Sequence, residues 1–299
     1  MKSPWKWLRS RGADAVSPLT AQMRESWDRD GLLVLPGFYS PAEVEDAQAS
    51  LREAWEQGAP RIVVDDLVTG ERLPLARVSE QARREHRFKV SDLYLEREAV
   101  RRLALNERIT PIVAALLGQP PVLCNSLSFE QGSAQPDHVD SLYMTPRTPH
   151  HLVAIWVALE DTHPDAGPLR YYPGSHKIPQ YVFSNGSHHF IQDEMPLWDR
   201  HMRAQVEALK LQPEVFLARK GDVFVWSAYL LHGGSDIRDP ARTRKSVVFH
   251  YLSKQDCLAH RLALAPEGPG FWLYRQHPAV PGEDDPAWPP LPATPLIRP

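Results

Sequence analysis

The sequence predicts a mainly β fold, an antiparallel sandwich or barrel with helices packed outside it. Two contrasts along the chain predict this class. Helical segments with clear start and stop signals precede residue 120, whereas segments rich in β-branched and aromatic residues follow it. Gly, Pro, Asn and Asp separate the later segments, as turns separate short strands. Helices first and short strands afterwards favour one sheet-rich core with flanking helices.

Several elements are expected before residue 120. Residues 19–31 have helical composition and end at Gly31, a residue type typical of helix C-caps. The apolar run 32–38 predicts a strand. Residues 96–118 predict one helix, or two helices broken near Pro111.

The helix with the strongest local signals occupies residues 40–58. Ser40 is an N-cap residue, Pro41 follows it in the first helical position, and Glu43 completes a capping box. Gly58 provides the stop. These signals are local, so the helix is expected whatever the rest of the fold does.

The expected strands lie in the second half of the chain, where they surround one inserted helix at residues 192–210. They occupy residues 121–132, 151–161, 168–174, 214–234 and 245–254.

The last 34 residues, 266–299, hold 10 of the 29 prolines, a density that is incompatible with a regular helix or a central strand. The expected organisation is therefore a flexible tail (1–18), one domain (19–262) and a Pro-rich C-terminal extension (263–299). The extension also carries aromatic residues, which favour packing on the body of the protein or on a second subunit in a homodimer. These residues are Phe271, Trp272, Tyr274 and Trp288.

Composition excludes several classes of partner. The formal net charge is -3 at pH 7, which provides no electrostatic case for nucleic acid or anionic membrane. No apolar run reaches the roughly 18 residues that a membrane span requires. The basic, Trp-containing start is a solvated tail or, as the rarer alternative, a membrane-surface segment. Cys124 and Cys257 are isolated, which favours a reducing compartment and a cytoplasmic protein.

A candidate metal site begins with "DHVD". In an extended segment His138 and Asp140 point to the same face, so both can reach one ion. Imidazole and carboxylate together suit Fe(II), Mn(II) or Zn(II). The spacing alone is weak evidence in a chain with 13 histidines, because a histidine hydrogen-bonded to a nearby carboxylate has the same pattern.

A third ligand is expected at His232, which ends a strongly apolar strand directly before Gly233 and Gly234. A polar ring at the end of a buried strand needs a partner, and a Gly pair lets backbone or ligand approach closely. Arg244 opens the next strand. If the two strands are antiparallel neighbours, it shares the cavity with His232 and presents a planar donor fork to a carboxylate. Arg242 is the competing candidate.

In this order the motifs resemble the phytanoyl-CoA dioxygenase family of Fe(II)- and 2-oxoglutarate-dependent oxygenases. The resemblance covers roughly residues 25–255. It rests on His-x-Asp at 138–140, "VAIWVALEDTHPDAGPLRYYPGSHK" at 153–177, "GDVFVWSAYLLHGGS" at 221–235 and "RTRKSVVFHY" at 242–251. It implies a double-stranded β-helix, that is a jelly-roll or cupin-like core, with Fe(II) and 2-oxoglutarate as cofactors and O2 as cosubstrate.

The resemblance also implies roles for single residues. His138, Asp140 and His232 match the iron ligands, Arg244 matches the arginine that binds 2-oxoglutarate, and Trp156 matches an aromatic residue near the cosubstrate. The implied reaction is hydroxylation of an aliphatic C–H bond of a small molecule through a ferryl intermediate, with release of succinate and CO2. Because Asp140 is present, the chain resembles the hydroxylases of the family and not its halogenating members.

Substrate contacts are expected from the loop after the first ligands and from the inserted segment. Their aromatic, histidine and arginine content favours a polar metabolite, a sugar or a natural-product intermediate. The candidate residues are Tyr143, Met144, Arg147, His150 and His189.

Three alternatives remain open. The same chemistry ends in desaturation, epimerisation or ring closure when the substrate places its radical differently. A cupin-like, metal-dependent isomerase or lyase uses the same core without O2. A catalytically silent binding module is the third, and the complete set of ligand types argues against it.

Overall fold

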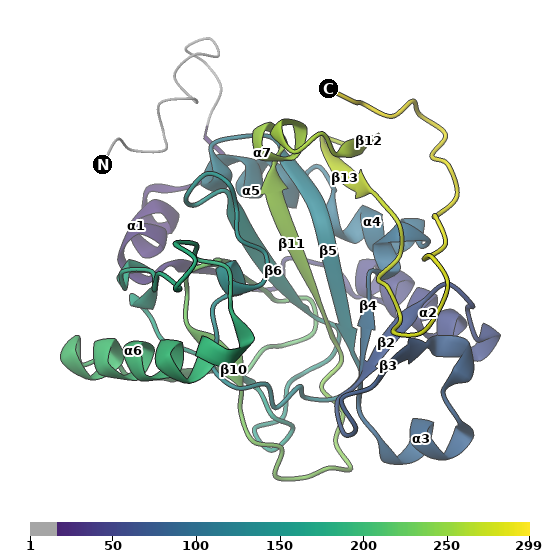
Figure 1. Ribbon diagram of the computed structural model, residues 1–299, viewed down its shortest axis with the longest axis horizontal. Helices are drawn as coiled ribbons and strands as arrows, with labels where there is room; N and C mark the ends of the chain where they lie inside the picture. The colour runs from purple at the N-terminus through teal and green to yellow at the C-terminus, as the bar shows by residue number, and fades with distance from the viewer. Residues whose placement is uncertain (1–16) are drawn as a thin grey trace.

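The computed structural model describes residues 17–299 and confirms the sheet-rich jelly-roll core with flanking helices (Figure 1). The expected tail at residues 1–18 lies almost wholly outside the described residues. The helices are α1 (Ala21–Asp30), α2 (Pro41–Gln57), α3 (Glu80–Glu85), α4 (Glu98–Ala104), α5 (Ile109–Leu117), α6 (Met195–Ala208) and α7 (Lys254–Ala259). Within residues 17–299, no helix has the length and apolar character needed to cross a membrane.

Two sheets face each other. The larger runs in the order β1-β9-β6-β11-β5-β4-β2-β3, with the hairpin β12-β13 joined to it through β5, and the smaller in the order β10-β7-β8. The strands before residue 160 are β1 (Leu32–Leu35), β2 (Val63–Asp66), β3 (Arg72–Pro74), β4 (Phe88–Ser91), β5 (Pro121–Phe129) and β6 (Leu152–Ala158). The later strands are β7 (Leu169–Tyr171), β8 (Glu214–Phe216), β9 (Val223–Ser227), β10 (His232–Gly234), β11 (Ser246–Ser253), β12 (Ala263–Glu267) and β13 (Gly270–Tyr274).

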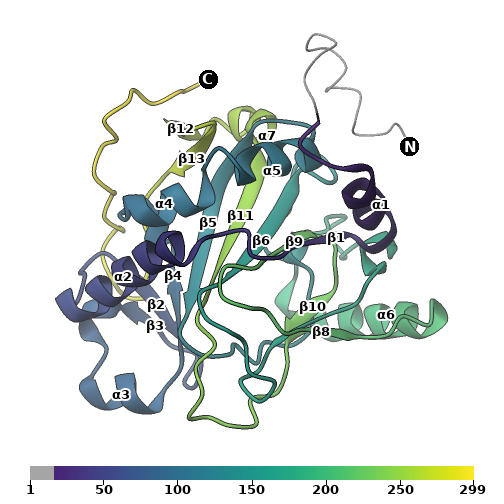
Figure 2. The ribbon, with the colours of Figure 1, turned by 180° about the vertical axis from the view of Figure 1, so that it is seen from behind.

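The central strands are largely apolar because both faces of the large sheet are buried. In β6, Val153 and Ile155 belong to the core under the helices, whereas Ala154 and Trp156 face the small sheet. This alternation follows from the two-residue period of a strand. Figure 2 shows α2, α4 and α5 in front of the long strands, so the opposite face of the sheet is left for the site.

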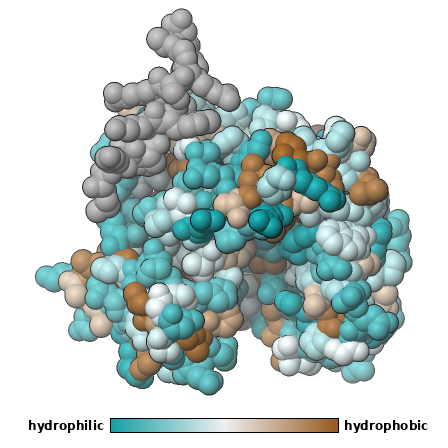
Figure 3. Space-filling model, turned by 45° about the horizontal axis from the view of Figure 1, so that its top comes forward, coloured by the Kyte–Doolittle hydropathy of each residue, from teal (hydrophilic) through white to brown (hydrophobic). Residues whose placement is uncertain are grey.

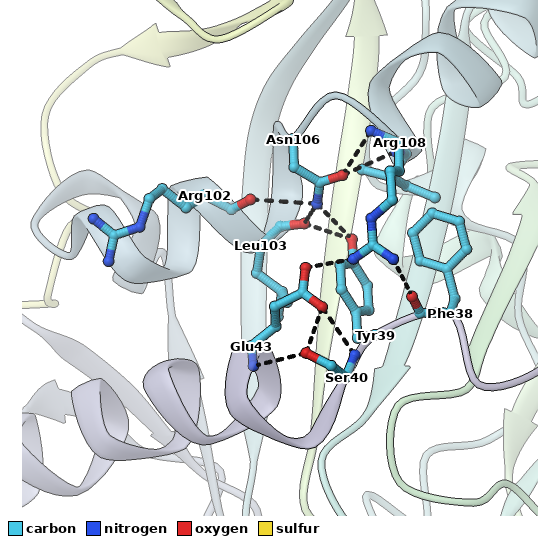
Figure 4. A network of polar contacts seen from close by, with 9 residues as sticks. Phe38, Tyr39, Ser40, Glu43, Arg102, Leu103, Asn106 and Arg108 are labelled. Carbon is cyan, nitrogen blue, oxygen red and sulfur yellow. Dashed lines mark hydrogen bonds and ion pairs between the residues drawn. The ribbon is translucent and has the colours of Figure 1, made fainter.

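The capping signals of α2 are confirmed and tie the helix to its neighbours (Figure 4). Ser40 and Glu43 form the predicted capping box. Arg108 pairs with Glu43 and donates to the carbonyl of Phe38 at 2.7 Å. Tyr39, which is buried, donates its hydroxyl to the carbonyl of Leu103 at 2.6 Å. The local helix signal and the long-range contacts therefore agree.

Residues 96–118 form two helices, as one of the expected alternatives had it, but the break lies between α4 and α5 at residues 105–108. Pro111 is inside the first turn of α5. A proline is tolerated there because the backbone N–H groups of a first helical turn have no intrahelical acceptor.

The expectation that the C-terminal extension holds no central strand was wrong in its first part. The hairpin β12-β13 forms there, and β13 pairs in parallel with β5. Pro266 is accommodated because the outer edge of β12 is bridged only at Leu264, by Ile297, and Pro266 lies beyond that bridge. Trp272 is buried, with the guanidinium of Arg101 4.9 Å from its ring centre, so the extension packs on the body of the protein.

Figure 3 shows hydrophilic residues over most of the face seen there, with apolar residues in small patches.

Candidate active site

The three expected ligands converge on the inner side of the jelly roll. His138 lies in the loop after β5 and forms a two-way backbone bridge with His232, the first residue of β10. Val139 between the first two ligands has an extended backbone, which turns His138 and Asp140 to the same face as the spacing predicted. Gly233 allows the bridge, because a Cβ there would lie 2.6 Å from an oxygen of Asp137.

The ligand atoms are close enough to share one ion. The Nε2 atoms of His138 and His232 each lie 3.8 Å from Oδ1 of Asp140, and one atom from each residue falls within 4.8 Å of the others. All three residues are buried. Two imidazole nitrogens and one carboxylate oxygen on one side of an open space are the donor set of non-haem Fe(II) oxygenases, so the residues fit the metal.

Hydrogen bonds aim these ligand atoms at the common point. The Nδ1 atoms of His138 and His232 lie 2.8 Å and 3.0 Å from backbone carbonyls, which places the ring proton on Nδ1 and leaves the Nε2 lone pair as an acceptor. The amide nitrogen of Gln135 lies 3.4 Å from Nε2 of His138. Trp226 donates its Nε1–H to Oδ2 of Asp140 at 2.8 Å, which leaves Oδ1 for the metal.

Electrostatics favour the protonation states that a metal needs. Burial, together with the charge of His232, lowers the pKa of His138 to about 4. Burial by itself would raise the pKa of Asp140, but the charges of His250 and His232 outweigh it and lower that pKa below its usual range. Near neutral pH the site therefore presents a neutral imidazole beside a carboxylate.

Arg244 faces the same cavity as the three ligands. It is 3% exposed, donates to the carbonyl of Gly167 at 3.2 Å and has no partner at Nε. Its guanidinium lies 5.7 Å from the ring centre of Trp156, and no ion pair joins it to a carboxylate of the described residues. A buried cation without an acid is matched to an anionic ligand such as the far carboxylate of 2-oxoglutarate.

The competing arginine is placed elsewhere. Arg242 lies on the surface and pairs with Asp239 at 3.0 Å. The argument that brought His232 and Arg244 together was wrong in one step, because β10 and β11 are in different sheets and are not neighbours. The two residues meet because the two sheets face each other.

The expected substrate residues divide into two groups. Tyr143, Met144 and His189 line a groove of about 590 Å³ beside the metal cavity, and the Tyr143 ring contacts the His138 ring edge-on at 5.8 Å. Arg147 and His150 line neither the groove nor the metal cavity.

The sequence predicted some residues of the cavity and missed others. Trp156 was expected there and does line the cavity, with its Nε1 unpartnered. Three further residues that line the cavity were not predicted, namely Trp226, Gln135 and His250. A signal existed for His250, because it follows Val248 by two residues on β11 and therefore shares its face of the strand.

Comparison with known proteins identifies the family. The family described as "Phytanoyl-CoA dioxygenase (PhyH)" matches residues 27–246. The chain belongs to this family. Two curated relatives, both phytanoyl-CoA dioxygenase domain-containing protein 1 homologs, are 32% identical, one over 89 residues from Caenorhabditis briggsae and one over 80 residues from Caenorhabditis elegans. These matches cover 28% and 25% of this chain, and 31% and 28% of the relatives, which is less than a third of their length.

Solved structures share the fold of this family member. EctD from S. alaskensis, with 2-oxoglutarate and 5-hydroxyectoine, has a TM-score of 0.58 at 19% identity, over 82% of this chain and 79% of that one. The carbocyclase SnoK from nogalamycin biosynthesis has a TM-score of 0.57 at 18% identity, over 81% and 88% of the two chains. The epimerase SnoN has a TM-score of 0.52 at 20% identity, over 78% and 81%. Membership of this family agrees with the expected oxygenase class.

Proposed function

We propose that this protein hydroxylates an aliphatic C–H bond of a small molecule, such as a polar metabolite, a sugar or a natural-product intermediate. Iron is held by His138, Asp140 and His232, and 2-oxoglutarate by Arg244. The observation that carries the proposal is the unpaired, buried guanidinium of Arg244 in the cavity that contains the three ligand atoms. An iron site alone fits many enzymes, whereas a buried cation beside it requires an anionic cosubstrate.

The residues of the chain would divide the work in the following way. When bound, iron and 2-oxoglutarate activate O2 for C–H oxidation with release of succinate and CO2. The three ligands occupy one side of the metal site and leave the other side to cosubstrate and substrate. Trp226 orients Asp140 through its Nε1–H. Trp156 forms the wall beside the Arg244 guanidinium and, with the buried surroundings, keeps water away from that charge.

A second outcome of the same chemistry is epimerisation, ring closure or desaturation. Two structures with this fold are described as a carbocyclase and an epimerase, so the fold accommodates such reactions. The residues that hold iron and 2-oxoglutarate are the same in either case, and the substrate decides between them. A cupin-like isomerase is disfavoured, because it has no use for the buried Arg244.

The test is anaerobic addition of Fe(II) and 2-oxoglutarate, followed by the visible charge-transfer band of chelated 2-oxoglutarate. We expect the band in the wild type, its loss in His232→Ala and a much weaker band in Arg244→Ala. Arg242→Ala is the matched control and keeps the band, because Arg242 is exposed and paired with Asp239. A folded, iron-loaded wild type without the band would contradict the proposal.

The remaining partners and the compartment stay predictions. A cytoplasmic location is supported by two buried cysteines, Cys124 and Cys257, that form no disulfide. The homodimer through the extension is less favoured, since Trp272 packs within the same chain. Light scattering of the purified protein decides it.

A further inference from the structure

The groove beside the metal cavity continues directly from it. Strand β11 lines both, because Val248 and His250 face the metal cavity and Leu252, two residues further along, lines the groove. The ring of Tyr143 also lines the groove and contacts the ring of the expected metal ligand His138 at 5.8 Å. The groove volume of about 590 Å³ is in the range of small-molecule sites. A substrate that lies in the groove can therefore present a C–H bond to the metal.

The floor of the groove is apolar. It is formed by Cys124, Met144, Leu252 and Leu273, which belong to one apolar cluster. Cys124 and Leu273 are buried, whereas Met144 and Leu252 are partly exposed. Apolar surface gains free energy when a ligand removes it from water, so this floor favours a ligand with an apolar surface of its own.

The charged and amide side chains of the groove already have partners within the protein. Arg275 pairs with Asp92 at 2.5 Å and donates to the carbonyl of Gln276 at 3.0 Å. Asn125 donates to the same carboxylate at 3.0 Å, and its amide oxygen lies 3.0 Å from Nδ1 of His250. Asp92 is 1% exposed, so a ligand that took Arg275 away would leave a buried carboxylate without its cation. The described residues of the groove therefore offer no unpaired permanent charge to an ionic substrate.

The remaining polar residues form a neutral rim. Thr145 donates its hydroxyl to the carbonyl of Ser141 at 2.7 Å and lies 3.2 Å from Nδ1 of His189. Tyr143 is 43% exposed, and its ring packs against Phe190 at 5.3 Å. This rim suits a few hydroxyl groups at the edge of a mainly apolar molecule.

The hairpin β12-β13 supplies one wall of the groove in a fixed position. The hydroxyl of the buried Tyr94 lies 3.2 Å and 3.1 Å from the carbonyl oxygens of Cys124 and Leu273, which pins β13 beside β5. A wall that is ordered before binding loses little conformational entropy when a ligand arrives. Leu252 and Leu273 both lie outside residues 27–246, so the family match does not cover this part of the groove.

We propose that Leu252 and Leu273 are specificity-determining residues that bind a compact apolar body of the substrate, a carbocyclic ring or a branched aliphatic group. The substrate places its few hydroxyl groups toward Tyr143 and carries no charge in the groove. This inference deepens the proposed oxygenase function and rests on it. Among the substrates proposed above, it selects a natural-product intermediate with an apolar ring system and disfavours a free sugar.

The first experiment compares three probes that share a six-membered carbon ring and differ in apolar surface, namely menthol, cyclohexanol and myo-inositol. Full-length protein is loaded with Mn(II) and 2-oxoglutarate, and paramagnetic broadening of the probe proton signals reports binding near the metal. The Zn(II) form is the diamagnetic control. We expect saturable broadening, with an affinity at least tenfold higher for menthol than for myo-inositol. Broadening that is the same with Zn(II) overturns the inference, because the probe then binds away from the metal.

The second experiment tests the two leucines. Contact with one leucine side chain is worth about a factor of ten in an equilibrium constant, so Leu252→Gln and Leu273→Gln should each bind menthol about tenfold more weakly. Leu258→Gln is the matched control and should bind as the wild type, because Leu258 packs on the same apolar cluster but does not line the groove. Leu252 is partly exposed, so Leu252→Gln keeps the test valid if the substitution at the buried Leu273 prevents folding.

The outcomes separate the two proposals. A folded, iron-loaded wild type without the iron–2-oxoglutarate band contradicts the proposed function itself. A normal band together with equal affinities for the three probes overturns the apolar substrate class. A menthol affinity that Leu252→Gln leaves unchanged, or that Leu258→Gln lowers to the same extent, overturns the role of the two leucines.

Discussion

The Arg244→Leu substitution removes the buried charge that is expected to anchor 2-oxoglutarate. Leucine keeps an apolar side chain against Phe129 and Trp156 and removes every donor. Burial lowers the pKa of Arg244 to about 10. Arginine in water titrates at about 12.5 or above, and each pKa unit corresponds to about 1.4 kcal/mol. The charge therefore costs about 3 kcal/mol in the empty cavity, and a carboxylate ligand relieves that cost.

The expected effect on binding follows from the loss of one partner of a buried ion pair, which costs about 3–5 kcal/mol. At about 1.4 kcal/mol per tenfold change, the Kd for 2-oxoglutarate rises by roughly two to three and a half orders of magnitude. The ligand-free variant should unfold no more easily than the wild type. Removal of the desolvated charge offsets the loss of the charged hydrogen bond to Gly167, which is worth about 1.5–3 kcal/mol.

Thermal and denaturant unfolding with Zn(II) and 2-oxoglutarate measures both effects. At a ligand concentration of 100 times Kd the wild type gains about 2.7 kcal/mol. The same concentration leaves at most about 0.4 kcal/mol for a variant that binds a hundredfold more weakly. Arg242→Ala should behave as the wild type. Binding by Arg244→Leu within tenfold of the wild type would refute the assignment of this arginine.

Three further predictions concern the metal ligand shell, acid stability and the extension. Trp226→Phe removes the donor to Asp140 and should weaken metal binding by about 10- to 100-fold in a chelator competition; an unchanged affinity would show that the contact is dispensable. Burial lowers the pKa of His176 from 6.5 to about 4, so between these values the unfolded chain binds more protons and stability falls as pH falls. Urea titrations at pH 4.5 and 7 give the loss of unfolding free energy between these pH values, and we expect a smaller loss in His176→Gln than in the wild type. An equal loss in both proteins would contradict this prediction. Deletion of residues 263–299 should lower the free energy of unfolding by several kcal/mol, because it removes a buried hairpin, whereas Leu291→Ala on the exposed part should have no effect; equal stability of the two would mean that the hairpin is not part of the core.

Much of the fold was predictable because its signals are local. The capping box of α2 needs only four neighbouring residues, and it formed as expected. The strands β6, β9 and β11 are largely apolar because both faces of the sheet are covered, and such runs indicate buried strands without any knowledge of their partners. The hairpin β12-β13 was missed because proline density masked it. Pro266 is acceptable only on an unpaired edge, and edges are defined by the assembled sheet.

The sequence by itself determined the types of ligand and the extended spacing of His138 and Asp140, since both follow from chemistry and strand geometry over a few residues. The choice between Arg242 and Arg244 was decided only by the tertiary structure, because two arginines two residues apart have the same chemistry until one is buried. The same is true of His250. Its place in the cavity depends on contacts with Asn125, from another strand, and Asp140, from a distant loop, and such long-range contacts do not exist until the sheets close on each other.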